Sequence, residues 1–373
     1  MKIAHVISTF PPHVGGMGEI AYQELDKLTL KGIKAVVFTL KYSKVDYSSD
    51  NKNGFKIERL RPIIKYGDAG FIPQLFFKLK DFDLVHLHYP FYVSAQCVWL
   101  SGKLRKQKYV LTYHMDAQST GFKKILQKIY DLVWANIILN GAEKIFIVDP
   151  SLIKKSKYLQ KIDQNKIVIL PNAIAVDTFC PWPKELKDNK LKYEKIILFV
   201  GNFLAVKRLD LILEAIKDLK DIKLLIVGGY DNLEKYKNIA KNLGVIEKVS
   251  FEGNCKDKRQ LANYYNLADI TIISSDYESF SLVTLESLAC ECPVLVSDAI
   301  PFSKEIIDRG AGFTFKKGDV KDLSLKISKM LSLNSEETNS MGKNGRKLVQ
   351  EKYQWESHIN KLVEVYKNVS SKK

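Results

Sequence analysis

Cysteine is scarce in this sequence. The chain has five cysteines among 373 residues, and no two of them form a Cys-x-x-Cys pair. This pattern argues against both a disulfide framework and a structural zinc site. We expect the thiols to be buried as small apolar side chains.

A long apolar run is also missing. No stretch is apolar over the roughly 20 residues that a helix needs to cross a bilayer. The segment Met1–Ser8 has the pattern of a β-strand, with neither the cationic region nor the cleavage site of a secretory signal. We therefore expect a cytoplasmic protein, and the sequence leaves open a location at the inner face of the plasma membrane.

Acidic residues are outnumbered by basic ones. The 58 lysines and arginines against 42 aspartates and glutamates give a net charge of +16, which favours anionic partners such as nucleic acid, an anionic membrane or a phosphorylated small molecule. Most of the excess is lysine spread over predicted helices, and no nucleic-acid-binding module is present. We therefore expect no nucleic-acid partner and retain the other two classes.

Strand-like and helical segments alternate along the chain in two series. The hydrophobic content of 46% is that of a folded protein, and 373 residues suit two domains. The alternation is typical of α/β proteins with doubly wound parallel sheets. A proline-rich segment at 171–183, continued by a charged one to 194, separates the series as a linker. The predicted strands are 3–7, 35–40, 84–88, 110–113, 145–148 and 167–170, then 196–200, 224–227, 249–252, 270–274, 294–297 and 312–315.

The segment Asp276–Cys290 carries the most functional information. A β-rich run precedes it, and apolar residues recur at helical spacing in its second half. We expect Glu278 in a strand-to-helix turn and Glu286 about a turn and a half inside the helix. The N–H groups from Phe280 to Val283 and the helix dipole would then form an anion site. A diphosphate bound there would have a carboxylate on either side, although two glutamates at this spacing also occur on helices without a function.

Together with Glu291–Asp298, this segment resembles the donor-site signature of glycosyltransferase family 4. In that family a glutamate, any residue and Phe-Gly are followed by a second glutamate, then by alanine, and later by Gly-x-Pro-Val. Here Ser281, Ser287 and Glu291 stand where the family usually has Gly, Ala and Gly. The resemblance extends over essentially the whole chain.

The resemblance implies a GT-B fold, in which two Rossmann-like, doubly wound parallel-sheet domains face a central cleft. The corresponding boundaries are an acceptor-side domain at 1–175, a nucleotide-sugar donor domain at 176–352 and a C-terminal helix at 353–373 that packs back on the first domain. It also implies transfer of a sugar from a nucleoside-diphosphate sugar to an acceptor hydroxyl with retention, in the synthesis of a cell-surface polysaccharide or glycolipid. The acceptor would be a saccharide or a lipid-linked molecule, and no metal or other cofactor is expected.

Two glycine-containing loops are candidates for binding the diphosphate. After the first strand, Gly15 and Gly16 would let the backbone approach a phosphate, and a tight turn without a ligand is the alternative. A dinucleotide-binding fingerprint is excluded, because the second strand ends without the acid that would hold a ribose. In the second loop, Lys207 can neutralise a diphosphate. The family has arginine at Asn202 and glycine at Arg208, so Lys207 is the first candidate and Arg208 the second.

Histidines stand at the ends of two predicted strands in the first half. His114 follows a strand where open α/β sheets bind ligands, and the family has a histidine here that contacts the donor sugar. A structural hydrogen bond is the alternative for a lone histidine. His86 and His88 point the same way by the two-residue period of a strand. With Asp116 they are candidates for the acceptor side, and a metal site is not favoured because no third ligand accompanies them in sequence.

The resemblance gives each candidate a role. Lys207 and the amides of Phe280 to Leu282 would stabilise the leaving diphosphate, Glu286 would hold the ribose diol and Glu278 a sugar hydroxyl. The predicted catalytic residues are thus His114, Lys207 and Glu278. The predicted donor-binding residues are Gly15, Gly16, Asn202, Lys207, Arg208, Phe280, Ser281, Leu282 and Glu286.

Two segments are candidates for contact with a membrane. The run Gly121–Trp134 is cationic and aromatic at helical spacing, which suits an anionic bilayer surface. A helix that covers a sheet needs the same pattern and is the favoured interpretation. Phe71–Lys78 is a second, shorter candidate. A lipid-linked acceptor becomes plausible if both segments face one side.

Two other functions remain open. The first is a GT-B enzyme of another kind, a nucleotide-sugar epimerase or a phosphorylase. The second is a catalytically weak nucleotide-sugar-binding subunit, for which the unusual Asn202 and Ser281 argue.

Overall fold

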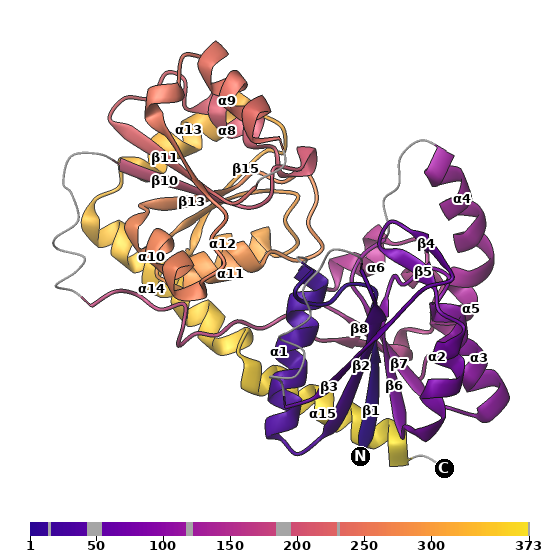
Figure 1. The fold of residues 1–373 in the computed structure, drawn as a ribbon. Helices are drawn as coiled ribbons and strands as arrows, with labels where there is room; N and C mark the ends of the chain where they lie inside the picture. The colour runs from indigo at the N-terminus through magenta and orange to yellow at the C-terminus, as the bar shows by residue number, and fades with distance from the viewer. Residues whose placement is uncertain (14–15, 43–53, 117–121, 184–194, 230–231, 372–373) are drawn as a thin grey trace. The chain divides into compact units, whose positions relative to one another are not determined.

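The computed structural model describes residues 1–13, 16–42, 54–116, 122–183, 195–229 and 232–371. The chain forms two compact units (Figure 1). The first unit comprises Met1–Pro171 together with Glu356–Lys373, and the second comprises Asn172–Trp355. The boundaries predicted from the sequence were 175/176 and 352/353, so each differs from the observed boundary by a few residues.

The first unit is built on a seven-stranded parallel sheet of order β3-β2-β1-β6-β7-β8-β9. The six strands predicted in this half are present. Two features were not predicted: the edge strand β3 and the antiparallel hairpin β4-β5. The strands are β1 Lys2–Val6, β2 Lys34–Leu40, β3 Lys56–Leu60, β4 Ile64–Tyr66, β5 Ala69–Phe71, β6 Leu84–Tyr89, β7 Tyr109–Tyr113, β8 Ile145–Ile147 and β9 Ile167–Ile169.

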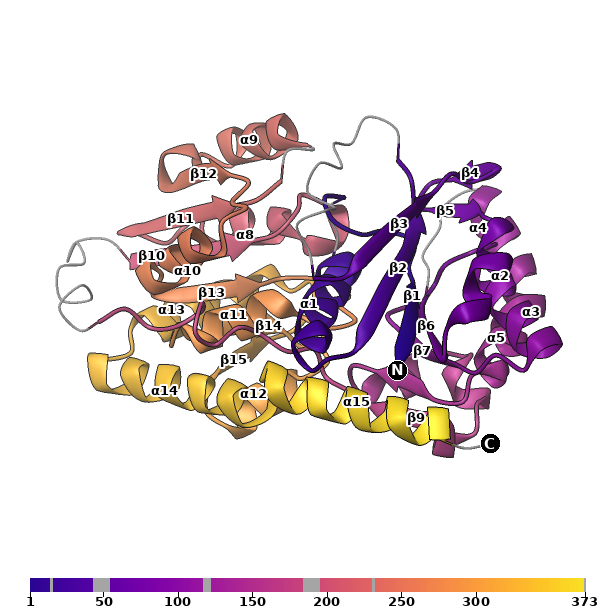
Figure 2. The same cartoon turned by 60° about the horizontal axis from the view of Figure 1, so that its bottom comes forward.

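Helices cover both faces of this sheet (Figures 1 and 2). On one face α1 and α15 are joined by a buried bond, because His358 Nε2 lies 2.9 Å from Glu24 Oε1. On the other face α2, α3 and α5 lie side by side. The helices are α1 Gly16–Leu30, α2 Gln74–Lys78, α3 Ala95–Arg105, α4 Phe122–Tyr130, α5 Asn136–Gly141, α6 Ser151–Lys155 and α15 Trp355–Ser371.

The second unit contains a six-stranded parallel sheet of order β12-β11-β10-β13-β14-β15. This is the strand order of a Rossmann fold. All six strands predicted in this half are confirmed, each within two residues at either end. They are β10 Lys195–Val200, β11 Ile222–Val227, β12 Val249–Gly253, β13 Ile270–Ile273, β14 Val294–Ser297 and β15 Gly312–Phe315.

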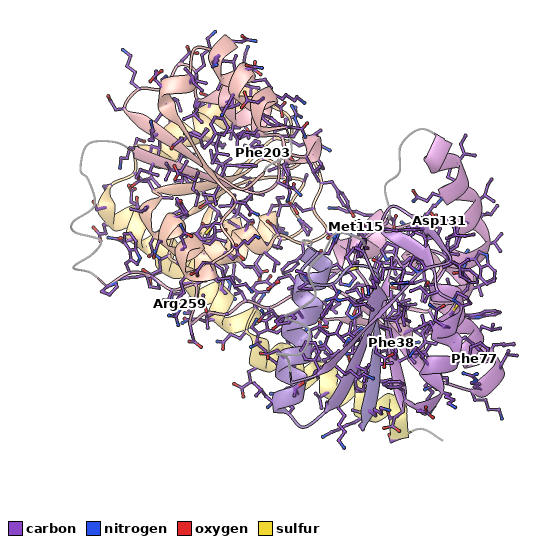
Figure 3. All side chains as sticks on the ribbon, in the orientation of Figure 1. Phe38, Phe77, Met115, Asp131, Phe203 and Arg259 are labelled. Carbon is purple, nitrogen blue, oxygen red and sulfur yellow. The ribbon has the colours of Figure 1, made fainter. Side chains whose placement is uncertain are left out.

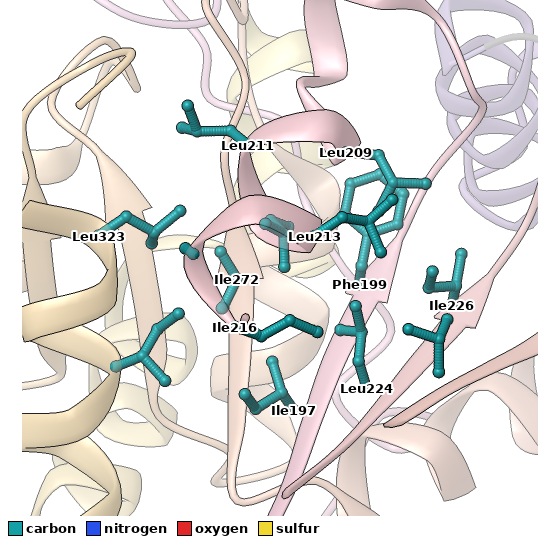
Figure 4. Close-up of a cluster of buried hydrophobic side chains, with 14 of the residues drawn as sticks. Ile197, Phe199, Leu209, Leu211, Leu213, Ile216, Leu224, Ile226, Ile272 and Leu323 are labelled. Carbon is teal, nitrogen blue, oxygen red and sulfur yellow. The ribbon is translucent and has the colours of Figure 1, made fainter. Parts of the chain in front are cut away.

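Apolar strands flanked by amphipathic helices create the core of the second unit. Ile197 and Phe199 of β10 pack with Leu224 and Ile226 of β11 under the helix that carries Leu213 (Figure 4). Burial on both faces explains why these strands are almost continuously hydrophobic. The helices are α8 Leu209–Ala215, α9 Leu233–Asn242, α10 Lys258–Leu267, α11 Leu282–Ala289, α12 Ser303–Asp308, α13 Val320–Leu331 and α14 Ser335–Lys352.

Local signals fix where several helices begin. Asp257 caps α10 and Asp319 caps α13 with side-chain oxygens that accept backbone N–H bonds. Asn334 and Glu337 form a reciprocal capping box at the start of α14. Among the described residues, no helix combines the length and the apolar character needed to cross a membrane.

Each sheet has one point where its strand order reverses. It lies between β1 and β6 in the first unit and between β10 and β13 in the second. In open α/β sheets ligands bind beyond the carboxyl ends of the strands at such a point.

Candidate functional site

The reversal point of the second sheet brings two of the predicted residues into contact. Lys207 ends a 3₁₀ turn after β10, and Glu278 follows β13. Lys207 Nζ donates to Glu278 Oε1 at 2.5 Å, and Ser275 Oγ donates to the same oxygen at 2.8 Å. The two charged side chains are 23% and 12% exposed. They form a partly buried ion pair that a ligand could reach.

Hydrogen bonds join the two loops that carry this pair. Ser274 Oγ donates to the carbonyl oxygen of Lys207 at 2.7 Å, and Asp276 N donates to that of Val206 at 2.8 Å. These bonds hold the loop after β10 in a fixed position relative to the loop after β13.

Arg208 is placed differently from Lys207. Its backbone has φ of +52°, a left-handed conformation that favours glycine. This explains why the family has a glycine here. The Arg208 guanidinium pairs with Asp210 at 3.0 Å and with Asp276 at 3.4 Å. The hydrogen bond with Asp210 is the main reason why the pKa of Arg208 is raised. Two carboxylates thus compensate its charge, and Lys207 stays the first candidate for a diphosphate.

Helix α11 begins where the sequence predicted. Ser281 is its N-cap residue, but the Ser281 side chain makes no capping bond; its hydroxyl accepts a hydrogen bond from Thr284 Oγ1 at 2.9 Å. The dipole of the helix points its positive end at this turn. Ser281 has φ of −124°, which any residue adopts, so the serine causes no backbone strain. Phe280 is buried against Phe302, with ring centroids 5.2 Å apart.

Glu286 lies within α11 and is held from the neighbouring helix. Tyr265 of α10 is fully buried, and its hydroxyl donates to Glu286 Oε2 at 2.7 Å. Burial first, and then the Glu286 charge, raise the pKa of Tyr265 well above its ordinary value. The tyrosine stays protonated and orients the carboxylate. Sequence reasoning missed Tyr265, because its contact with Glu286 depends on how α10 packs beside α11.

Glycines after β11 support the loop that carries Lys207. A Cβ on Gly228 would lie 2.2 Å from the carbonyl oxygen of Gly201, and one on Gly229 would lie 2.4 Å from the Phe203 ring. Both glycines also have positive φ. Two consecutive glycines directly after a predicted strand are a pattern from which the sequence could have indicated this close contact. Asn202 beside this contact is exposed.

The remaining glycine candidates lie in the first unit. Gly15 is outside the described residues. Gly16 begins α1, is exposed and has open space where a Cβ would stand. Gly18, which the sequence did not single out, is the tightly packed one, because a Cβ there would lie 2.8 Å from the carbonyl oxygen of Thr9.

The predicted histidines form one buried group in the first unit. His86 and His88 are fully buried and His114 is 8% exposed. His86 bonds to Tyr366 and Thr112, and His88 bonds to His114. The sequence predicted that His86 and His88 lie on the acceptor side. In this structure both side chains are buried in the core of the first unit, so neither is exposed to an acceptor. Asp116 is half-buried and accepts hydrogen bonds from Ser156 and Tyr113.

One group of described residues has the composition of a metal site. Ligand atoms of His5, Glu24, His86 and His88 lie within 4.8 Å of one another, and all four residues are buried. The ring nitrogens of the three histidines are already engaged in hydrogen bonds. The group is therefore a hydrogen-bonded network, and the expectation of no metal stays a prediction.

The sequence also contains an Asp-x-Asp pattern, a common arrangement in metal sites. Asp81 and Asp83 stand just before β6. Asp83 accepts a hydrogen bond from the backbone N–H of Lys2 at 2.7 Å. The pattern lies at the amino ends of the strands, opposite the edge where ligands bind.

Comparisons with known proteins agree with this architecture. A family model described as Glycosyltransferase Family 4 matches residues 14–178, and one described as Glycosyl transferases group 1 matches residues 183–348. The chain is 25% identical over 385 residues to an uncharacterized glycosyltransferase of Methanocaldococcus jannaschii, covering 97% of each chain.

Two solved structures show the same fold. Sucrose-phosphate synthase of Thermosynechococcus elongatus aligns with a TM-score of 0.82 at 21% identity over 100% of both chains. The HepE protein of Anabaena, in complex with UDP-glucose, aligns with a TM-score of 0.80 at 14% identity over 99% of this chain and 100% of its own.

Proposed function

The chain belongs to the family 4 glycosyltransferases, whose fold is GT-B, and from this premise we propose the reaction that it catalyses. It moves a sugar from a nucleoside-diphosphate sugar to an acceptor hydroxyl and retains the configuration at the anomeric carbon. The donor class is supported by the UDP-glucose complex of HepE, which has the same fold. The acceptor is a saccharide or a lipid-linked molecule of a cell-surface polysaccharide or glycolipid.

The observation that carries the proposal is the contact between Lys207 and Glu278 at the reversal point of the second sheet. A donor places a diphosphate and a sugar side by side, and this pair offers a cation and a carboxylate side by side. When the donor binds, Lys207 turns to the diphosphate and Glu278 accepts a hydrogen bond from a sugar hydroxyl.

The leaving diphosphate gains negative charge as the glycosidic bond breaks. Lys207 and the amides of Phe280 to Leu282 stabilise that charge, and each such interaction contributes about 3 kcal/mol. Ser281 leaves these amides uncapped by its side chain. Glu286, oriented by Tyr265, accepts two hydrogen bonds from the ribose diol. Asn202 and Arg208 complete the donor site beside Lys207.

The reaction needs no protein nucleophile. The acceptor attacks from the face that the diphosphate leaves, and a phosphate oxygen of the donor takes the acceptor proton. One glycosidic bond forms as another breaks, and the nucleoside diphosphate carries the proton away. His114 contacts the donor sugar, and side-chain and helix-dipole charge take the place of a metal ion at the diphosphate.

A surface of the first unit supports peripheral contact with the inner face of the plasma membrane. Helices α2, α3, α4 and α5 and the π-helical turn Asp131–Ala135 carry exposed apolar side chains that together we call the apolar patch. Phe77 projects outward from this side of the unit (Figure 3), and 66% of it is exposed. The patch consists of Phe77, Leu100, Leu104, Ile125, Ile129, Leu132, Val133 and Ile137.

The helices of the apolar patch also carry a cavity and exposed lysines. The cavity of about 320 Å³ is lined by aromatic side chains, among them Phe76, Trp99 and Trp134. Lys78 of α2, Lys103 of α3 and Lys128 of α4 are exposed, as is Lys106, which directly follows α3. Exposed apolar side chains together with lysines of the same helices suit the boundary between acyl chains and anionic headgroups. This surface supports a lipid-linked acceptor.

A donor screen tests the proposed reaction. UDP-, GDP- and ADP-sugars are added to the purified chain, and one of them should raise the unfolding temperature, because a ligand at one hundred times its dissociation constant stabilises by about 2.7 kcal/mol. That donor should then release free nucleoside diphosphate when an acceptor extract is added. An epimerase would convert the sugar of the donor without releasing nucleoside diphosphate. A binding subunit would be stabilised by the donor but would not turn it over. Either result would reject the proposal of a transferase.

A further inference from the structure

Four of the six histidines of the chain form a continuous hydrogen-bonded row inside the first unit. His5 lies on β1, His86 and His88 lie on β6, and His114 follows β7. Strand register aligns them, because His5 pairs with His86 across the sheet and His88 pairs with Thr112. Tyr366 of α15, the helix that covers this sheet together with α1, contributes its hydroxyl group to the row.

The row can be followed atom by atom from Thr112 to His114. Thr112 Oγ1 lies 2.6 Å from His86 Nε2, and His86 Nδ1 lies 2.5 Å from the Tyr366 hydroxyl. That hydroxyl lies 3.4 Å from His5 Nε2, and His5 Nδ1 lies 3.1 Å from His88 Nε2. The last link joins His88 Nδ1 to His114 Nε2 at 3.1 Å.

Burial keeps these imidazoles neutral. Desolvation lowers the pKa of His5 to about 3 and that of His114 to about 4, and it lowers those of His86 and His88 well below 6.5. A neutral imidazole has one nitrogen that donates and one that accepts. Each link therefore fixes the direction of the next, and the whole row has two fully bonded arrangements, one the reverse of the other.

The Thr112 hydroxyl decides between the two arrangements. Thr112 is buried, and His86 Nε2 is its one hydrogen-bond partner among the described side chains. If His86 donated to Thr112, the threonine proton would have no acceptor, and a buried unpaired donor costs about 1–3 kcal/mol. Thr112 therefore donates to His86, His86 to Tyr366, Tyr366 to His5, His5 to His88 and His88 to His114.

We propose that Thr112 and Tyr366 are positioning residues that set the tautomer of His114, so that its Nδ1 carries the proton. His114 Nδ1 has no bond to another described residue, and the side chain is 8% exposed. The row thus ends in an N–H group directed away from the network and able to donate to an oxygen. This inference rests on the proposed function in taking His114 as the residue that contacts the donor sugar.

The functional consequence is a defined polarity at His114. A hydrogen-bond donor suits a hydroxyl oxygen of the sugar, and the opposite tautomer would present a lone pair there. Which nitrogen of a histidine carries the proton is set by the bond that the other makes. Residues that orient a metal-ligating histidine in the same way contribute about 10- to 100-fold to affinity or activity, and we expect an effect of that order at His114. The Tyr366 hydroxyl, on the last helix, orients His114 in this way through His5 and His88.

Nitrogen-15 NMR of the full chain labelled at histidine tests the tautomer directly, because protonated and unprotonated ring nitrogens give separate signals. In the wild type we expect His114 to be protonated at Nδ1. Tyr366→Phe interrupts the row, so neither arrangement of the remaining links is favoured, and the proton of His114 should be shared between Nδ1 and Nε2. Tyr109→Phe is the matched control: it also removes a buried hydroxyl of this unit, one that donates to the carbonyl oxygen of Ile138, and should leave His114 unchanged.

A second pair of variants covers the case that Tyr366→Phe does not fold. Thr112→Val removes the proton at the start of the row, and Thr112→Ser keeps it. The valine variant should shift the His114 tautomer and lower kcat by about 10-fold at unchanged KM for the donor, and the serine variant should restore both. A His114 tautomer that is the same in all variants would overturn the proposal, as would a stoichiometric metal ion on the histidines of the purified protein.

The two readouts separate this inference from the proposed function. A tautomer that shifts without any change in kcat would uphold the row and reject the role of His114 in transfer. A wild type protonated at His114 Nε2 would reject the row, whatever the activity of the protein.

Discussion

At the scale of single residues, three departures from the family pattern have different physical consequences. Arg208 and Glu291 stand at positions where the family has glycine, and both adopt left-handed φ, +52° and +60°. A side chain in this conformation costs roughly 1–2 kcal/mol. Ser281 has an extended φ, so the glycine there is not required by the backbone. The sequence alone could show that these residues were unusual, but only the backbone angles show which of them is strained.

The buried histidines make stability depend on pH. In the unfolded chain a histidine takes up a proton near pH 6.5, whereas the pKa values of His5 and His114 in the folded chain are about 3 and about 4. Between these limits the unfolded state binds more protons, so the free energy of unfolding falls as the pH falls below 6.5. Each such histidine contributes a slope of about 1.4 kcal/mol per pH unit, and His86 and His88 act in the same direction.

Denaturant unfolding of the chain at pH 7 and pH 5 measures this slope. His13→Gln is the control, because His13 is not part of the row and is only half-buried; its slope should equal that of the wild type. Equal free energies of unfolding at the two pH values would show that these histidines are not held neutral in the folded chain.

At the scale of elements, the helix that carries Glu286 depends on a close contact with α14. A Cβ on Gly342 would lie 2.3 Å from the carbonyl oxygen of Glu291, and one on Gly345 would lie 2.6 Å from Leu288 Cδ2. Two glycines one helical turn apart thus let α14 approach the end of α11. The sequence around these two glycines is polar and does not indicate the contact. A glycine in a helix indicates close packing only when the element that packs against it is known.

Gly342→Ala should therefore destabilise the second unit, even though alanine is the better helix former. Overpacking of this kind costs about 1–3 kcal/mol, and the shift of α11 should also weaken donor binding. Ser340→Ala, an exposed change on the same helix, should alter stability by no more than about 0.5 kcal/mol. Thermal unfolding of both variants measures these changes in stability. A Gly342→Ala protein as stable as the wild type would contradict the packing described for α14.

The elements themselves were largely predictable, and the exceptions have a common cause. Buried parallel strands such as β10 and β14 are continuous apolar runs, which the sequence displays directly. Strand β3, Lys56–Leu60, lies at the sheet edge and is only partly buried. Its charged side chains hide the β pattern. Contacts between elements, such as Tyr265 with Glu286, leave no periodic trace at all.

At the scale of the whole molecule, the candidate residues are distributed over both units. The second unit carries Lys207, Glu278 and Glu286, and the first carries the histidine row and the apolar patch. The net charge of +16 suits both a diphosphate and an anionic membrane. The sequence indicated both partners, but the exposed apolar side chains of the patch become visible only when their burial is known.

The apolar patch should bind vesicles that contain phosphatidylglycerol more tightly than vesicles of phosphatidylcholine alone, and salt should weaken the binding. In a sedimentation assay Phe77→Asp together with Leu132→Asp should abolish it. Leu325→Asp, which changes a 68% exposed leucine of the second unit, is the matched control and should bind as the wild type does. Equal binding by the patch variant and the control would show that lipid contacts another surface.

Direct titration of the stabilising nucleoside-diphosphate sugar tests the central claim, that the second unit binds the donor through Glu286. Glu286→Ala removes two charge-assisted hydrogen bonds to the ribose, each worth about 1.5–3 kcal/mol. It should raise the Kd at least about 100-fold, whereas Glu234→Ala, at an exposed glutamate of the same unit, should leave the Kd unchanged. A Glu286→Ala protein that binds the donor as tightly as the wild type would contradict the account.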